Sequence, residues 1–557
     1  MPEEEGRTVG VIDFACQPGS YRHWRLETEG PVATVTMVVD PRGGLADDYE
    51  LKLNSYDLSV DIELYGIVQR LRFEHPEIGC VVLTGGLEKV FCAGANIQML
   101  AGSSHDHKVN FCKFTNETRL GIEDASEVSG QRWVAAINGT AAGGGYELAL
   151  ACDEILLVDD RSSTVSLPEV PLLGVLPGTG GLTRVVDKRR VRRDLADLFA
   201  TRAEGVRGEQ AVAWGLVDSM APPSGFVAHV RRRAEAIAAE SDRPGGRGVA
   251  LRSLTREMSD DRIGYSHLSV ELDRRMAAAH FVVEGPAGAE PATAEELLEA
   301  GDTAWVLALC RELDDAILHL RFNEPELGTW VLRSTGDTDA VLGVDDTLGG
   351  LSDHWLVREI RAYWKRTLKR FDTSARTLVA LVEPGSCFAG TLAELVMAAD
   401  RSFMFDGEPE TDLPAPTLTL SLANDGLYPM ANGLSRLATR FWGHDEQLAT
   451  ARDHFGKRLT ASECVDLGLV TFAVDNLDWE DEVRLTLDER AAFSPDALTG
   501  LEANLRYAGP ETMETKIFAR LSAWQNWIFL RPNASGPEGA LRRYGTGSRP
   551  SYDPKRV

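Results

Sequence analysis

The sequence predicts an α/β protein built from two tandem copies of one unit, with a helical segment at the C-terminal end. The first observation is that short apolar runs with strand character alternate with helical patterns, which is typical of a parallel sheet with helical crossover connections. The second is an internal repeat: 71–79 reads LRFEHPEIG, and 320–328 reads LRFNEPELG. An apolar run follows in both places, so the sequence indicates a duplication.

The composition is that of a soluble globular protein. The chain has 557 residues, too many for one hydrophobic core, and 43% of them are hydrophobic and 26% charged. A net charge of -27 argues against nucleic acid or an acidic membrane as a partner, because both bind electropositive surfaces. The eight cysteines lack metal-binding spacing and are interpreted as reduced thiols. Residues 1–6 lack the pattern of a signal peptide, and no apolar run reaches the length of a membrane span. We therefore expect a cytoplasmic protein with no nucleic-acid or membrane partner.

The first half reads as strands and helices in turn. Strands are indicated by β-branched or apolar runs, and helices by apolar residues at helical spacing. Small or glycine-rich stretches between them, at 91–97 and 174–181, would let a ligand approach the main chain. The expected strands are 32–39, 80–84, 134–137 and 155–158, and the expected helices are 56–73, 108–129 and 146–152.

A turn of three glycines, Gly143, Gly144 and Gly145, joins one of these strands to the helix that follows it. Glycines leave the main-chain amides open to close approach, and the helix directs its positive N-terminal end at the same place. An anion, or an oxygen that becomes one, would be stabilised there. Glu147, in the first turn of the helix, presents a carboxylate beside these amides.

The second half repeats the order of these features but not their chemistry. CAGA at 92–95 becomes VLGV at 341–344, and the three-glycine turn becomes FAGTLA at 388–393. Bulky side chains would crowd the places that are open in the first copy. Glu394 aligns with Glu147, but no clear second acid accompanies it. We therefore expect the active site in the first copy and a structural role for the second.

Domain boundaries are predicted from glycine- and proline-rich stretches at 241–248 and 284–292, which read as linkers. The helical pattern with large aromatics at 512–530 predicts a helix that docks on a core or forms a dimer, with lining of an acyl pocket as the alternative. The expected division is a first domain at 1–283 with trailing helices, a linker at 284–300, a second domain at 301–480 and a helical segment at 481–557.

Four motifs in register resemble those of the crotonase (enoyl-CoA hydratase/isomerase) superfamily: FCAGANI at 91–97, NGTAAGGGYELALACD at 138–153, PE at 168–169 and PGTGG at 177–181. The resemblance implies a ββα-spiral fold, degenerate in the second copy, that binds a coenzyme A thioester. It also implies that the main-chain amides of Ala95 and Gly144 hold the thioester oxygen. The other motif residues expected to contact substrate or coenzyme A are Cys92, Ala93, Asn96, Ile97, Gly143 and Gly145.

Glu147 and Glu169 fall where the hydratases of this superfamily carry an acid/base pair, although the interval between them is lengthened by an insertion around 159–163. Two carboxylates in one partly apolar pocket can split their pKa values, so that one holds a proton while the other accepts one. Which glutamate is the acid stays open at this point. Without the resemblance, Glu147 would read as a first-turn helix charge and Glu169 as a loop carboxylate. The resemblance implies no metal or flavin cofactor, no G-x-G-x-x-G motif follows a strand to indicate a nicotinamide cofactor, and coenzyme A is part of the substrate.

Three other features are weaker candidates. His105 and His107 have no carboxylate or thiol at ligand spacing and favour a solvated loop over a metal site. The basic run KRRVRR at 188–193 reads as a solvated helix face or as a site for the phosphates of coenzyme A. Ser55 and Tyr56, in a polar segment, are interpreted either as substrate contacts or as loop packing.

A closer resemblance extends over nearly the whole chain, to the ring-opening enzymes of aerobic, CoA-dependent benzoate degradation. It implies that 2,3-epoxy-2,3-dihydrobenzoyl-CoA and two waters give 3,4-didehydroadipyl-CoA semialdehyde and formate. An ordinary enoyl-CoA hydratase or isomerase would use the same residues, and a non-catalytic acyl-CoA-binding scaffold is the alternative from another class. A homodimer is expected. The segments that carry this resemblance are 49–58, 61–64, 71–79, 518–527 and 531–533.

Overall fold

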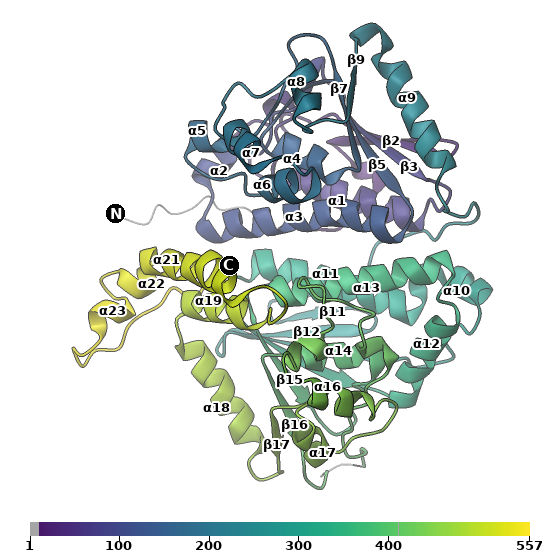
Figure 1. The fold of residues 1–557 in the computed structure, drawn as a ribbon. Helices are drawn as coiled ribbons and strands as arrows, with labels where there is room; N and C mark the ends of the chain where they lie inside the picture. The colour runs from purple at the N-terminus through teal and green to yellow at the C-terminus, as the bar shows by residue number, and fades with distance from the viewer. Residues whose placement is uncertain (1–9, 410–411) are drawn as a thin grey trace. The chain divides into compact units, whose positions relative to one another are not determined.

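The computed structural model describes residues 10–409 and 412–557. The chain divides into two compact units, Met1–Ser253 and Leu254–Val557 (Figure 1). Each unit contains a sheet whose later strands are parallel and whose first strands pair antiparallel, with helices on both faces, which confirms the α/β fold class. No helix in the described ranges is both long enough and apolar enough to cross a membrane.

The first unit contains nine strands and nine α-helices among its described residues. The strands are β1 (Trp24–Glu29), β2 (Val32–Met37), β3 (Cys80–Gly85), β4 (Lys89–Cys92), β5 (Arg132–Ile137), β6 (Gly139–Ala142), β7 (Glu154–Val158), β8 (Val165–Ser166) and β9 (Ser219–Ala221). The helices are α1 (Leu58–Phe73), α2 (Ile97–Gly102), α3 (His105–Val128), α4 (Gly144–Ala151), α5 (Glu169–Leu173), α6 (Gly181–Thr183), α7 (Arg193–Ala200), α8 (Gly208–Ala213) and α9 (Pro223–Ala239). Short 3-10 or π turns lie at Pro18–Ser20, Lys52–Asn54 and Arg184–Lys188.

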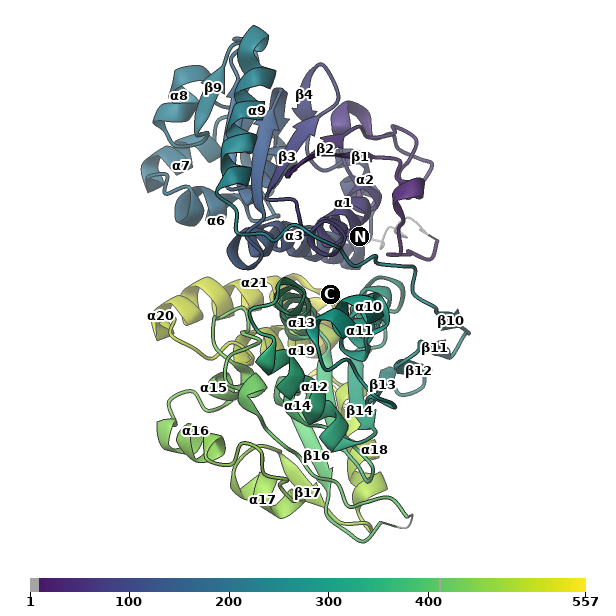
Figure 2. The same cartoon turned by 90° about the vertical axis from the view of Figure 1, so that its right-hand side faces the viewer.

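Its main sheet has the order β1-β2-β3-β5-β7-β9. β1 and β2 pair antiparallel, and every later neighbour is parallel. α9 packs Phe226, Val230 and Ile237 on one face, and α1 and α3 lie side by side on the opposite side of the sheet (Figures 1 and 2). Because both faces are covered, the central strands are continuous apolar runs, as parallel strands buried on two sides require.

A second sheet in this unit brings the small-residue motifs together. β4, β6 and β8 form three parallel strands that were not expected from the sequence. Their two to four residues each, mostly small, give too short a pattern to recognise. Since the strands are parallel, the chain leaving β4, the turn into α4 and the chain leaving β8 all emerge at the same edge.

The second unit repeats the plan, with the sheet order β10-β11-β12-β13-β14-β15-β16-β17. The strands are β10 (Glu257–Met258), β11 (Arg262–Gly264), β12 (Leu268–Asp273), β13 (Ala278–Glu284), β14 (Thr329–Thr335), β15 (Thr377–Val382), β16 (Arg401–Phe405) and β17 (Phe472–Val474). The helices are α10 (Ala294–Ala300), α11 (Trp305–Asn323), α12 (Thr338–Gly350), α13 (Trp355–Thr373), α14 (Gly390–Ala398), α15 (Arg436–Arg440), α16 (Asp445–Arg452), α17 (Ala461–Asp466), α18 (Trp479–Ala492), α19 (Pro495–Leu505), α20 (Met513–Thr515), α21 (Ser522–Leu530), α22 (Pro532–Ser535) and α23 (Ala540–Arg543). Short 3-10 or π turns lie at Gly301–Thr303, Leu422–Asn424 and Lys516–Leu521.

Strand register supports the duplication. In each unit the last strand of a hairpin pairs in parallel with the next strand, and the first residues of the two strands are partners. The first residue of that next strand is also the partner of the first residue of the strand after it. α18 packs Leu487 on one face of the second sheet. It takes the place that α9 has on the main sheet of the first unit. The matched pairs are Val32–Cys80 and Cys80–Arg132 in the first unit, and Ala278–Thr329 and Thr329–Thr377 in the second.

The domain boundaries differ from the expected ones. The first unit ends at Ser253 rather than at 283, and 257–284 form strands β10 to β13 of the second sheet instead of trailing helices. The expected linker at 284–300 contains α10 and belongs to the second unit. The physical reason is that β13 is the parallel neighbour of β14, so the second copy begins with its own hairpin.

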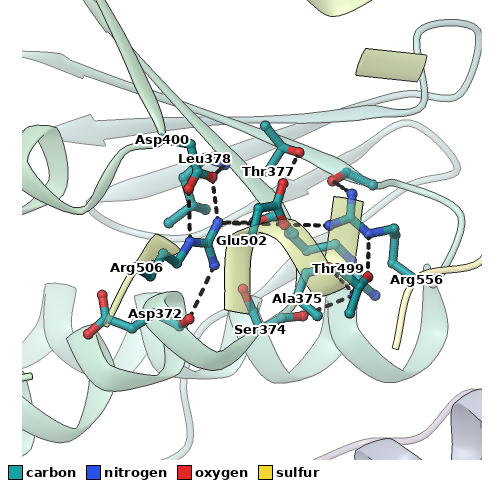
Figure 3. A network of polar contacts seen from close by, with 12 residues as sticks. Asp372, Ser374, Ala375, Thr377, Leu378, Asp400, Thr499, Glu502, Arg506 and Arg556 are labelled. Atoms are coloured by element: carbon teal, nitrogen blue, oxygen red, sulfur yellow. Dashed lines mark hydrogen bonds and ion pairs between the residues drawn. The ribbon is translucent and has the colours of Figure 1, made fainter. Parts of the chain in front are cut away.

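The segment 481–557 is likewise part of the second unit rather than a separate region. Figure 3 shows the polar network that fastens it to the start of β15. Glu502 on α19 accepts a hydrogen bond from the Thr377 hydroxyl at 2.5 Å and pairs with Arg556 at 2.5 Å. Arg506 pairs with Asp400 at 2.5 Å.

The helical pattern at 512–530 forms α20, a π turn and α21, as predicted. Its packing differs from that of a core helix: none of these three elements contains a buried residue, and Met513, Phe518 and Leu530 are 74–80% exposed. The side around Ile528 and Trp524 approaches Gly500 of α19. Core docking is therefore limited to one side of the helix, and the dimer-forming role stays a prediction.

Candidate active site

The predicted oxyanion-hole residues lie in two chain segments that are in contact. Ala95 follows β4, and Gly144 is the first residue of α4. Gly94 has a φ of +88°, and a Cβ at its position would lie 3.0 Å from the nitrogen of Gly144. The absence of a side chain at Gly94 therefore lets the two segments approach each other. Across the described part of the chain, no group accepts a hydrogen bond from the amides of Ala95 or Gly144. We call these two amides the amide pair.

Local structure makes the Gly144 amide a stronger donor. Gly143, with φ +54°, turns the chain into α4, and its carbonyl accepts hydrogen bonds from the amides of Tyr146 at 2.9 Å and Glu147 at 3.0 Å. The carbonyl of Gly143 and the N–H of Gly144 belong to one peptide group, so bonds to that carbonyl polarise that N–H. The N-terminal end of α4 adds its partial positive charge. Together these effects favour negative charge on an oxygen held by the amide pair.

Glu169 is the first residue of α5 and faces the same turn. A Cβ on Gly143 would lie 2.7 Å from Glu169 Oε1, so the carboxyl group lies over that glycine. The side chain is 9% exposed, and its Oε2 has no hydrogen-bond partner among the described residues. Burial, followed by the charge of Glu147, raises the pKa of Glu169 to about 7. The group can therefore both give and take a proton near neutral pH.

Glu147 is held differently. It is 2% exposed, and its Oε1 accepts hydrogen bonds from the amides of Thr179 at 3.0 Å and Gly181 at 2.7 Å. The Thr179 hydroxyl donates to Oε2. Donors on both oxygens suit the ionised carboxylate, which accepts only. The PGTGG motif thus supplies the bonds that fix Glu147, a role that its sequence alone did not show.

The longer interval between the two glutamates is absorbed before β8. Asp160 Oδ1 accepts hydrogen bonds from the amides of Ser162 at 2.8 Å and Ser163 at 2.7 Å, which closes a local turn. β8 then pairs normally with β6. The insertion therefore leaves Glu147 and Glu169 close enough for one charge to raise the pKa of the other.

The remaining predicted contacts divide into exposed and internal residues. Ala93 and Ile97 are exposed beside the amide pair, and Gly143 and Gly145 are buried in the turn itself. The Cys92 thiol donates to the Asn54 carbonyl at 3.0 Å. The Asn96 side chain caps α2 through the Met99 amide at 2.9 Å and also donates to the Glu50 carbonyl at 2.9 Å. The side chains of Cys92 and Asn96 therefore make internal contacts that shape the loop.

Three residues near this site carried no clear signal in the sequence. Cys112 on α3 lies 3.5 Å from the position of a Cβ on Gly178, and burial, then the charge of Glu147, raises the pKa of its thiol to about 11. Arg119 on the same helix is fully buried and donates to the Gly144 carbonyl at 3.2 Å. Tyr56, considered as a contact or as packing, is buried against Gly144. Helical spacing could mark these positions as inward-facing but not as neighbours of a turn far along the chain.

Two of the three weaker candidates are placed by the structure: the basic run, and His105 and His107, which lie in the first turn of α3 rather than in a loop. In the basic run, Lys188 pairs with Glu123 at 2.9 Å and Arg189 with Asp218 at 2.9 Å, so both side chains serve internal contacts. Among the described residues, no group of three or more His, Cys, Asp or Glu side chains is placed to hold a metal ion.

Comparison with known proteins identifies the family of the chain. Residues 50–281 match the enoyl-CoA hydratase/isomerase family model. The chain is 54% identical, over 98% of both proteins, to the benzoyl-CoA-dihydrodiol lyase of Aromatoleum evansii. YngF of Bacillus subtilis (strain 168), named as an enoyl-CoA hydratase/isomerase, is 35% identical over 31% of this chain and 63% of its own.

A solved structure of an enoyl-CoA hydratase from Bacillus anthracis is 28% identical, with a TM-score of 0.34, over 39% of this chain and 77% of that one. Family membership rests on the full-length relative rather than on this partial overlap. The chain therefore belongs to the enoyl-CoA hydratase/isomerase (crotonase) family and, within it, to the relatives of benzoyl-CoA-dihydrodiol lyase.

Proposed function

We propose that this protein opens the ring of 2,3-epoxy-2,3-dihydrobenzoyl-CoA with two waters, giving 3,4-didehydroadipyl-CoA semialdehyde and formate. The observation that carries the proposal is the 54% identity to benzoyl-CoA-dihydrodiol lyase over 98% of both chains. The two free amides and the two buried glutamates of the first unit supply groups that such a reaction needs.

In the proposed mechanism, the amides of Ala95 and Gly144 hold the thioester oxygen. They would polarise the carbonyl, make the conjugated epoxide carbons electrophilic, and hold the electrons released when the carbon–carbon bond breaks. Preset amides act where negative charge develops, and removal of one donor from such a hole typically costs about 3 kcal/mol of transition-state stabilisation. No metal, flavin or nicotinamide enters the proposal.

The two glutamates take unequal roles in this proposal. Glu169, with an unpartnered oxygen and a pKa raised to about 7, is the group that exchanges protons as water adds to the ring. Glu147, tied by Thr179 and Gly181, keeps its negative charge and thereby keeps the proton affinity of Glu169 high. General acid–base catalysis is most effective when the pKa lies near the working pH, which favours Glu169 as the proton carrier.

The test is product analysis with the purified protein. Mass spectrometry should detect formate and the semialdehyde thioester in equal amounts from the epoxide of benzoyl-CoA, with no cofactor added and after treatment with a chelator. Rapid hydration of crotonyl-CoA without ring opening would favour an ordinary hydratase, and thioester binding without any product would favour a scaffold. We also propose a homodimer and a cytoplasmic location, which light scattering and cell fractionation measure.

A further inference from the structure

The main chain of Tyr56 sets the direction of one member of the amide pair. Tyr56 forms an isolated parallel bridge with Ala95: its N–H donates to the Gly94 carbonyl at 3.0 Å, and its carbonyl accepts from the Asn96 amide at 2.8 Å. In a parallel bridge the residue between these two partners directs its own N–H away from the bridge. The amide of Ala95 is therefore turned away from Tyr56 and left free to donate elsewhere.

The side chain of Tyr56 reaches the other member. A Cβ on Gly144 would lie 1.9 Å from the Tyr56 hydroxyl oxygen and 2.8 Å from its Cζ, so the phenol fills the space beside that glycine. Arg119 joins the two groups, because its Nη2 donates both to the Tyr56 hydroxyl at 3.0 Å and to the Gly144 carbonyl at 3.2 Å. Tyr56 thus contacts both Ala95 and Gly144, and Arg119 holds the Tyr56 hydroxyl in place.

Arg119 is itself fixed by the helices beneath the sheet. It is fully buried, its Nη1 donates to the Thr115 carbonyl at 3.0 Å, and the same nitrogen lies 3.7 Å from Asp61 Oδ1. The Thr115 hydroxyl donates to the other oxygen of Asp61 at 2.5 Å. A cation is buried only at a high cost in desolvation unless it is paired, and this pairing keeps the guanidinium in one position.

The second unit lacks this arrangement. Counted from the repeated segments 71–79 and 320–328, Tyr56 corresponds to Trp305, the first residue of α11. The indole Nε1 of Trp305 donates to the Glu284 carbonyl at 2.8 Å. The tyrosine is thus replaced in the copy that has also lost the glycine turn. The buried aromatic is thus kept in both units, whereas the hydroxyl that Arg119 holds is present in the first unit alone.

We propose that Tyr56 and Arg119 are positioning residues that hold the amides of Ala95 and Gly144 in the orientation at which both reach one thioester oxygen. The inference rests on the proposed function, since the oxygen is that of an acyl-CoA thioester. Tyr56→Phe removes only the hydroxyl that Arg119 holds. We expect kcat to fall about 10- to 100-fold while KM changes less than about threefold, because misplaced donors weaken transition-state binding more than substrate binding.

Infrared difference spectroscopy of bound benzoyl-CoA labelled with ¹³C at the thioester carbonyl gives a readout that a purely structural role would not move. The carbonyl band should shift to lower wavenumber on binding to the wild type, and the shift should be smaller in Tyr56→Phe. Arg119→Lys should act in the same direction, because a single ammonium nitrogen cannot take the places of both Nη2, which bonds the hydroxyl and the Gly144 carbonyl, and Nη1, which bonds the Thr115 carbonyl. Tyr428→Phe is the matched control: it loses a buried hydroxyl that contacts Thr391 at 3.1 Å in the second unit.

The control should keep the wild-type carbonyl shift and kcat. A Tyr56→Phe enzyme with both the wild-type shift and the wild-type kcat would overturn the inference. Failure of the proposed function looks different: the wild type would polarise bound benzoyl-CoA yet open no ring, and the inference would then be judged on the carbonyl shift alone.

Discussion

The two units share a backbone plan, yet corresponding main-chain amides have opposite states. Gly143 and Gly390 both have positive φ, +54° and +46°, at the turn into a helix. In the first unit the next amide, that of Gly144, donates to no group in the described ranges. In the second, the amide of Thr391 donates to Asp345 Oδ2 at 2.7 Å, and its hydroxyl donates to Oδ1 at 2.6 Å. The second unit fills its own anion site with a carboxylate from α12.

The acidic residues of the two units also differ in whether a charged partner neutralises them. Glu147 accepts hydrogen bonds from neutral groups, whereas Glu394 lies 2.9 Å from the guanidinium of Arg436. Leu422, 80% exposed, holds the place of Glu169, counted from the matched bridges at Ser166 and Thr419. A site for catalysis keeps polar groups unsatisfied, which stability disfavours. The second unit has satisfied or replaced each of them.

The largest expected effect is on kcat, and it distinguishes the two glutamates of the first unit from Glu394 of the second. Glu147→Gln and Glu169→Gln should each lower kcat by about 10² to 10⁴-fold, because a glutamine neither carries a proton nor keeps a negative charge beside its partner. Glu394→Gln should leave kcat per folded molecule unchanged. Steady-state kinetics with the epoxide, together with circular dichroism to confirm folding, measures all three. Wild-type turnover by either first-unit variant would contradict the assignment.

The next effect concerns the charge cluster that replaced the second site. Arg436 pairs with Asp372 at 2.6 Å and with Glu394 at 2.9 Å, and all three side chains are 1% exposed. Arg436→Met would strand two buried carboxylates, and we expect it to lower the free energy of unfolding by about 3–5 kcal/mol. Denaturant unfolding measures the change. Arg458→Met, which removes an exposed ion pair with Asp339, is the control and should leave stability unchanged.

Much of this comparison could be predicted from the sequence, and the limit is physical. Strand and helix periods, the repeat, and motif order gave the α/β class, the duplication and the positions of Gly144, Glu147 and Glu169. The roles of Arg119 and Asp345 were not predictable, because each acts through a contact with a turn more than twenty residues away along the chain. The boundary was misplaced because 257–284 carries no pattern that tells a strand of one sheet from a trailing segment of the other.

Opening the second amide site tests whether Asp345 stands in for a bound anion. Asp345→Ala removes the acceptor of the Thr391 amide and hydroxyl, and loss of these bonds should lower the free energy of unfolding by about 1–3 kcal/mol. Acetate or formate should restore part of that stability, because a small carboxylate fits the vacated position. Thermal unfolding in sodium acetate and in sodium chloride of equal ionic strength separates a specific effect from a salt effect.

Asp339→Ala, on the same helix but exposed, is the matched control for that experiment and should show no dependence on acetate. An Asp345→Ala protein that is equally stable in both salts would contradict the view of Asp345 as an internal anion. Burial raises the pKa of Asp345 to about 6. Since the carboxylate form is the one to be replaced, the rescue should be measured at pH 7 or above.

The smallest effect concerns the cost of keeping Glu169 unsatisfied. Its pKa is raised to about 7 in the folded protein, by burial first and by Glu147 second, whereas an unfolded glutamate titrates near about 4.3. Between these pH values the folded state binds more protons than the unfolded state, so this group makes stability fall as pH rises toward about 7 and adds no further change above it. Discounted for solvent screening, we expect Glu169→Gln to be more stable than the wild type by about 1–2 kcal/mol at pH 8.

That gain should shrink as the pH is lowered to about 5, because the wild-type glutamate then becomes protonated and resembles glutamine. Urea unfolding of both proteins at the two pH values measures the difference. Glu394→Gln should behave in the opposite way and lose stability at pH 8, because it weakens the buried pair with Arg436. If Glu169→Gln were instead less stable than the wild type at pH 8, Glu169 would be a satisfied structural carboxylate like Glu394, and the contrast between the two units would fail at its central residue.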